Sequence, residues 1–333
     1  MKTKTPNVSG RSAWLRDNIT KYFSFSAIII LLVALSLTQD NFLGTSNLKN
    51  LLRDTAPLMI MSAGMTMVLL FGSIDLSMGA VCSVSNVTYI HLKLAFQTAS
   101  AILSSPAGAM AVSLAFGLAS GLALGIIHVK LKVPPSSPPW ALCPYGSRWP
   151  SSSRRTPSRA QSLWGTVEWY KIAFGVVGLP LIVAIAIILF ITVLPVTPPS
   201  GRTIFCHRRQ RAHCPGGGMG VDRTKILVFA INGVLAALAG IFLAANLRSS
   251  APTIGDPFTL KIVAACALGG TSLAGGKGSE LGTILGVFTV AIIENGMNFI
   301  GVNAYYQNIV FGIFVLAAIA LTVDRSIRGQ IVK

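Results

Sequence analysis

The fold is decided by stretches such as AVSLAFGLASGLALGII, residues 111–127, which carries no charge and mixes large apolar side chains with glycine, alanine and serine. A helix that crosses a bilayer needs about 20 mostly apolar residues. Small residues let helix backbones approach closely in lipid, where burial of apolar surface gives little drive for association. The stretch therefore predicts a helix packed inside a bundle of membrane spans, since a single anchor would not need such faces.

Similar apolar stretches recur along the chain. The predicted spans are 22–38, 56–72, 74–91, 107–129, 174–194, 226–246, 258–274, 281–300 and 305–323. This pattern predicts an all-α, polytopic transmembrane bundle of about nine to ten spans, with residues 1–333 forming a single domain.

The composition agrees with a membrane protein. Of the 333 residues, 52% are hydrophobic and only 11% are charged, whereas soluble domains carry about 25% charged residues. The net charge of +17 comes mostly from residues between and beyond the apolar stretches. This placement fits cytoplasmic loops better than a nucleic-acid interface, so we expect membrane lipid, and no nucleic acid, as a partner.

Lysine and arginine also predict the orientation. The N-terminal tail and the C-terminal tail, with Arg325, Arg328 and Lys333, are both positive, so both termini are expected in the cytoplasm. Two cytoplasmic ends require an even number of crossings. Nine spans is odd, so one span is missing or one is re-entrant, and residues 134–164 contain no predicted span.

Two segments do not match the rest of the chain. Residues 136–163 and 206–218 are rich in arginine and proline within an otherwise apolar protein. They could be basic or disordered loops. Cysteine and histidine occur in the second segment, but their adjacent pairs do not match zinc-ligand spacing, and we expect no metal or cofactor. The cysteines and histidines concerned are Cys206, His207, His213 and Cys214.

The genetic code gives a third interpretation of these segments. The residues CHRRQRA, 206–212, can be encoded so that a shift of one base gives AIGGNER. The residues SSPPWALC, 136–143, can be encoded so that a shifted frame gives FIATLGTM, which opens a plausible apolar span. Both segments would then be frameshifted, and the second product would supply the missing tenth helix.

Several longer motifs carry a family resemblance. IDLSMGA at 74–80 and LGGTSLAGGKGSELGT at 268–283 form a specific combination, joined by VDRTKI at 221–226 and ENGMNFIGVNAYYQN at 294–308. The chain resembles the permease subunit of ribose-type ABC sugar importers over roughly 40–134 and 170–330, apart from the second anomalous segment. At the positions of the two anomalous segments, members of this family have sequences similar to FIATLGTM and AIGGNER, the strings that the shifted frames give.

The resemblance implies a function and a set of partners. It implies a permease of about ten helices in the bacterial inner membrane that translocates a monosaccharide and has no catalytic residues of its own. The partners implied are a second permease subunit, identical or related, a cytoplasmic ABC ATPase and a periplasmic sugar-binding protein. The alternative is a decayed or frameshifted permease product that cannot couple to its ATPase.

Two polar groups are candidates for the substrate pathway. Asp75 and Ser77 lie at the junction of the second and third spans, where Asp75 either caps the third helix or lines a cavity. Glu294, Asn295 and Asn298 lie on one span, and positions 294 and 298 share a helical face. Asparagine both donates and accepts hydrogen bonds, as sugar recognition requires. The alternative for this group is hydrogen bonding between helices.

The long loop before VDRTKI is the candidate ATPase contact. It is bordered by Arg202, Asp222 and Arg223, and by the resemblance it carries the short helix that docks on the ATPase. Asp222 could also simply cap a helix that starts at Arg223. An autonomous channel or secondary transporter is less favoured, because Asp75 and Glu294 are nearly the only ionisable residues expected inside the spans. The sequence also shows no Ser/His/Asp set and no paired carboxylates at the membrane interfaces, so it does not indicate a membrane enzyme.

Overall fold

The computed structural model describes residues 29–30, 32–39, 41–95, 105–131, 170, 172–174, 176–193, 221–273, 275–276 and 278–322. Within them the chain is almost entirely helical. The helices are α2 (Thr45–Leu70), α3 (Met78–Ala95), α5 (Pro106–Leu131), α8 (Leu179–Val193), α10 (Val221–Leu247), α11 (Asp256–Leu268), α12 (Glu280–Ile300) and α13 (Ala304–Thr322). Residues 29–30 and 32–38 are also helical. The predicted all-α bundle is confirmed.

A short antiparallel hairpin precedes α8. It pairs β1 (Ala173–Phe174) with β2 (Val177–Gly178) and occupies the start of the predicted span 174–194. That span therefore begins later than expected, at Leu179. Helix α2 begins at Thr45, well before the predicted start at 56. Its first turns contain polar residues and are only partly buried, so they lack the continuous apolar stretch on which the prediction relied.

Three helices in the described part of the chain are long and apolar enough to cross a membrane, namely α5, α10 and α12. In contrast, α11 has only 13 residues. At about 1.5 Å per residue it spans about 20 Å, less than the roughly 30 Å of a hydrocarbon core. It ends at Leu268 and is followed by Gly269 and by Gly270, which has a φ of 84°.

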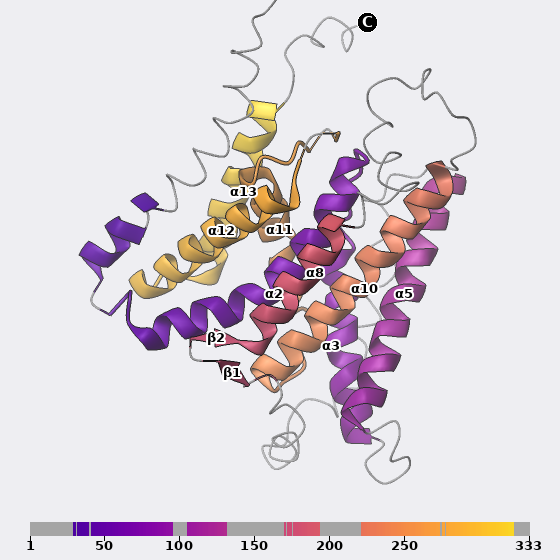
Figure 1. Ribbon diagram of the computed structural model, residues 1–333, viewed down its shortest axis with the longest axis horizontal. Helices are drawn as coiled ribbons and strands as arrows, with labels where there is room; N and C mark the ends of the chain where they lie inside the picture. The colour runs from indigo at the N-terminus through magenta and orange to yellow at the C-terminus, as the bar shows by residue number, and fades with distance from the viewer. Residues whose placement is uncertain are drawn as a thin grey trace, which may run out of the picture.

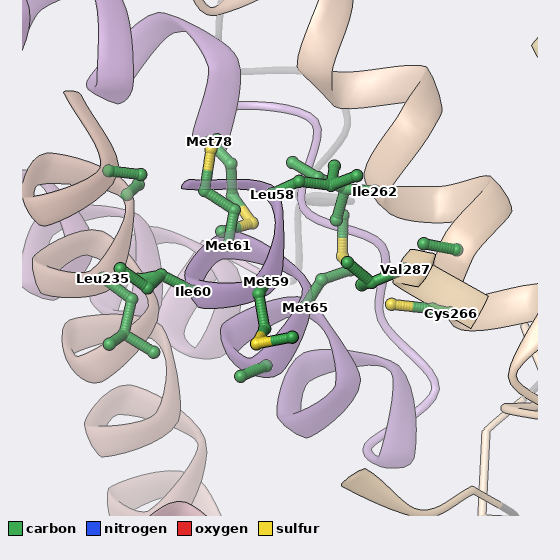
Figure 2. Packing of buried hydrophobic residues seen from close by; sticks show 14 of the residues in the cluster. Leu58, Met59, Ile60, Met61, Met65, Met78, Leu235, Ile262, Cys266 and Val287 are labelled. Carbon is green, nitrogen blue, oxygen red and sulfur yellow. The ribbon is translucent and has the colours of Figure 1, made fainter. Parts of the chain in front are cut away.

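Helix α2 occupies the centre of the bundle. Every residue from Thr55 to Leu70 is buried, and α2 contacts α8, α10, α11 and α12. Figure 1 shows α3, α5 and α10 together on one side of α2, and α11, α12 and α13 on the other. In Figure 2, Met59 and Met65 of α2 lie between Leu235 of α10 and Val287 of α12. The core is therefore organised around one fully enclosed helix.

Glycines bring α5 and α10 into close contact. A Cβ added to Gly233 of α10 would lie 2.3 Å from the carbonyl oxygen of Gly117 on α5, and one added to Gly121 would lie 2.3 Å from the carbonyl oxygen of Phe229. No side chain fits in such a gap. The small-residue face of 111–127 is thus an interface between helices, as the sequence predicts.

Two glycine-containing helix breaks meet inside the bundle. The first follows α2 and includes Gly72, at a φ of 72°, and the second lies between α11 and α12 and includes Gly275, at a φ of 89°. The backbone N–H of Gly276 donates a 3.0 Å hydrogen bond to the carbonyl of Leu70. A Cβ on Gly275 would lie 2.6 Å from Cα of Gly72. The described part of the glycine-rich stretch between α11 and α12 therefore packs against the break that follows α2.

Candidate substrate site

A pocket of about 260 Å³ lies where α2, α10, α11 and α12 meet. Its walls combine hydrogen-bonding groups with apolar side chains, as small-molecule sites commonly do. The polar residues are Asp54, Thr55, Asn246, Glu294, Asn295 and Asn298, and the apolar ones are Leu51, Leu58, Leu243, Leu247, Ile254, Phe258 and Ala291.

The wall formed by α12 contains the residues expected from the sequence. Glu294, Asn295 and Asn298 all line the pocket, because positions 294, 295 and 298 fall on neighbouring faces of one helical turn. The structure therefore brings these three predicted residues together.

Each of the three also links α12 to a different neighbour. Asn295 and Asn47 of α2 exchange reciprocal amide hydrogen bonds of 3.0 Å. Asn298 accepts a 2.8 Å bond from Gln307 of α13. The two interpretations of this polar group, pocket lining and bonding between helices, consequently describe the same side chains.

Glu294 is paired with a lysine that sequence reasoning missed. Lys261 of α11 donates a 2.6 Å hydrogen bond to Oε1 of Glu294, and its Nζ lies 5.3 Å from the ring centroid of Phe258 and 5.8 Å from that of Phe311. Lys261 is buried. In the sequence, Lys261 is visible only as a lone lysine in the apolar stretch 258–274. Its pairing with Glu294 neutralises a negative charge that binding of a neutral substrate does not require.

The part of the lining formed by α2 and α10 contains a second carboxylate. Asn246 of α10 donates a 2.9 Å hydrogen bond to Oδ1 of Asp54 on α2, and Nε of Arg53 lies 3.3 Å from the same oxygen. Asp54 precedes the predicted span 56–72 and Asn246 ends the span 226–246, so neither attracted attention as a membrane-embedded group. Only the fold shows that they lie together.

Asp75 belongs to a separate buried cluster. Its Oδ1 accepts hydrogen bonds from the backbone N–H of Ser77 at 2.8 Å and from the Ser77 hydroxyl at 2.5 Å. The Ser77 carbonyl accepts the first helical bond of α3, from Val81. Asp75 therefore holds the turn that leads into α3, and the described residues place Asp75 and Ser77 outside the pocket lining.

The cluster also contains residues that the sequence did not single out. Nδ2 of Asn232 on α10 donates a 2.7 Å hydrogen bond to Oδ2 of Asp75. Nearby, Ser73 Oγ and His128 Nε2 lie 3.2 Å apart. An asparagine inside the apolar stretch 226–246 was the available signal. The cluster ties the break between α2 and α3 to α10 and α5.

The candidate coupling residues are only partly described. Asp222 and Arg223 are exposed in the first turn of α10, which begins at Val221, so Asp222 lies inside the helix instead of capping one that starts at Arg223. Its negative charge still interacts favourably with the positive, N-terminal end of the helix dipole. Arg202, the segments 136–163 and 206–218, and both chain termini lie outside the described residues.

The described helices include membrane-spanning candidates, and a small pocket with polar lining lies between four of the helices. The chain belongs to the family described as branched-chain amino acid transport system / permease component, which residues 144–319 match. A permease subunit is itself not an enzyme, and the predicted resemblance is confirmed.

Curated relatives match nearly the whole chain. The ribose import permease protein RbsC of Escherichia coli (strain K12) is 33% identical over 323 residues, 95% of this chain and 97% of the relative. RbsC of Bacillus subtilis (strain 168) is 31% identical over 98% of this chain and 100% of the relative. The xylose transport system permease protein XylH of Escherichia coli (strain K12) is 27% identical over 96% of this chain and 95% of the relative. No solved structure matches the chain.

Proposed function

We propose that the chain is the transmembrane permease subunit of an ATP-binding cassette importer that carries a monosaccharide across the bacterial inner membrane. The observation that carries this proposal is the pocket wall formed by Glu294, Asn295 and Asn298. Amide and carboxylate groups together donate and accept hydrogen bonds, which is what a ring of hydroxyls requires. The names of the relatives, which specify ribose or xylose, support the same substrate class.

The proposal includes the partners of such a subunit. A second permease, identical or related, would complete the pathway, a cytoplasmic ATPase would supply the energy and a periplasmic protein would deliver the sugar. Both termini would lie in the cytoplasm. The loop bordered by Arg202, Asp222 and Arg223 would contact the ATPase, and the exposure of Asp222 and Arg223 at the start of α10 supports that placement.

Transport can be tested in proteoliposomes that contain the chain, its ATPase and the binding protein. We expect ATP-dependent uptake of radiolabelled D-ribose or D-xylose, and none when ATP is omitted. Uptake that persists without the ATPase would contradict the proposal, because it would identify an autonomous channel or secondary transporter.

We also propose that residues 136–163 and 206–218 are frameshifted segments of the permease gene. Resequencing codons 130–225 tests this. A restored frame would supply the tenth span and an intact coupling loop. If the printed frame is correct, this chain is expected to lack ATP-driven uptake, and the importer function would belong to its ancestor. Uptake at the level of a frame-restored chain would then overturn the frameshift proposal.

A further inference from the structure

The pocket lining contains two carboxylates and, among its described residues, no lysine, arginine or histidine. One carboxylate, Asp54, comes from α2 and the other, Glu294, comes from α12. The nearby cations Arg53 and Lys261 each pair with one of these carboxylates. A ligand in the pocket would therefore meet acceptors from two helices and no uncommitted positive charge among the described lining residues.

Each carboxylate is held in place by one of its oxygens. Oδ1 of Asp54 takes the bonds from Asn246 and Arg53, and Oε1 of Glu294 takes the bond from Lys261. The second oxygen of each has no hydrogen-bond donor within the described part of the chain. When one oxygen holds a carboxylate in place, the other oxygen can accept a hydrogen bond from a ligand hydroxyl. Binding then does not incur the entropy cost of ordering that side chain.

We propose that this pocket is itself a binding site for one neutral polyol, so that the permease selects its substrate independently of the binding protein, with Asp54 and Asn246 as specificity-determining residues. This inference rests on the proposed function and adds that the permease itself binds the sugar, with two residues of α2 and α10 that determine its specificity. Asn246, Asn295 and Asn298 supply donors and acceptors around the ring of hydroxyls, and Phe258 supplies an apolar surface for its C–H groups.

The same arrangement excludes anionic ligands. The carboxylate of a branched-chain amino acid or the phosphate of a sugar phosphate would lie near Asp54 and Glu294 without a free counter-charge. Because Arg53 and Lys261 are already paired with those carboxylates, an anionic group would lose hydration in the pocket without gaining a cation of its own. The pocket therefore favours neutral sugars over sugar phosphates, and its described lining offers no cation to the carboxylate of the amino acids named in the family's description.

Binding to the permease alone tests this inference. The full chain is purified in nanodiscs without ATPase or binding protein, and saturation-transfer difference NMR, which detects weak ligands, is recorded with D-ribose, D-xylose, L-leucine and D-ribose 5-phosphate. We expect signals that titrate for at least one neutral sugar and none for the leucine or the sugar phosphate.

Two variants locate the binding site. Asp54→Asn and Asn246→Ala are each expected to raise the Kd for the sugar at least about 10-fold, since each removes a charge-assisted or fixed hydrogen bond. Tyr306→Phe is the matched control, because it removes a polar group that is exposed on α13 and outside the pocket lining. It should bind as the unchanged chain does, and size-exclusion profiles verify that every variant is folded.

The outcomes separate this inference from the proposed function. If ATP-driven sugar uptake occurs in the complete system but no sugar binds the permease alone, the inference is wrong and the proposed function stands. Unchanged binding in folded Asp54→Asn or Asn246→Ala also overturns it. Binding of L-leucine without any sugar would contradict both.

Discussion

Asn232 of α10 and Asp75, in the break between α2 and α3, are joined by a 2.7 Å hydrogen bond from Nδ2 to Oδ2. Both side chains are buried. The amide is confined, because a Cβ on Gly64 would lie 2.4 Å from Oδ1 of Asn232. Asp75 consequently has hydrogen-bond donors on both oxygens, two from Ser77 and one from Asn232.

Replacing Asn232 with leucine should destabilise the protein. It leaves Oδ2 of Asp75 buried without its donor, which costs about 1–3 kcal/mol. We expect a clearly lower midpoint of thermal unfolding in detergent. Ser113→Ala is the matched control, because the buried Ser113 hydroxyl has no hydrogen-bond partner in the described residues. Equal midpoints for the two variants would argue against a stabilising role for the Asn232–Asp75 bond.

The contact between α5 and α10 gives a second prediction. In Gly233→Ala the new Cβ would meet the Gly117 carbonyl, so the helices must separate, at a cost of about 1–3 kcal/mol. Gly312→Ala is the control, because nothing lies within 4 Å of a Cβ there. In fluorescence-detected size exclusion after heating, the monodisperse peak of Gly233→Ala should disappear at a lower temperature than that of Gly312→Ala. Similar survival of both variants would mean that the interface can adjust.

At the contact between the two helix breaks, the cost of replacing Gly275 has two parts, backbone strain and steric conflict, and two variants can measure them separately. Gly301→Ala places alanine at a φ of 79° with nothing within 4 Å, whereas Gly275→Ala adds, at a φ of 89°, a collision with Gly72. Left-handed backbone alone costs alanine about 1–2 kcal/mol. We expect the unfolding midpoint of Gly275→Ala to fall well below that of Gly301→Ala. If the two midpoints coincide, the breaks do not press on each other.

The ion pair between Lys261 and Glu294 should show strong coupling. Lys261→Met leaves Glu294 without its cation, and Glu294→Gln leaves a buried lysine without its carboxylate. The double variant removes both charges and should be more stable than the sum of the single losses predicts, by about 1–3 kcal/mol. A double-mutant cycle from unfolding midpoints measures this coupling. Additive losses would indicate that the pair contributes only packing.

Most of the fold could be predicted from apolar runs and glycines. A run such as 111–127 identifies a helix because lipid requires internal backbone bonding, and glycine spacing indicates close packing. Helix ends were less predictable. The first turns of α2 are rich in polar residues and largely exposed, and the hairpin before α8 replaces part of an apolar run with strands. Local hydropathy carries no information about where the chain turns.

The candidate site was half predictable. Glu294, Asn295 and Asn298 lie on one helix, so their proximity follows from helical geometry. Their partners do not. Asn47, Lys261 and Gln307 come from three other elements, and the pairing of Asp54 with Asn246 joins positions far apart in the chain. Such contacts depend on tertiary arrangement, which the spacing of residues in one segment does not specify.

The shortness of α11 has a consequence for biogenesis. Its 13 residues include Lys261, and a lysine at the centre of an inserting helix costs about 2.5–3.5 kcal/mol. A segment this short and charged is a poor substrate for the translocon when it emerges from the ribosome alone. Glu294 is made later, on α12. We therefore expect α11 and α12 to enter the bilayer together, with Lys261 and Glu294 already paired, and synthesis that stops before residue 294 to leave α11 outside the membrane.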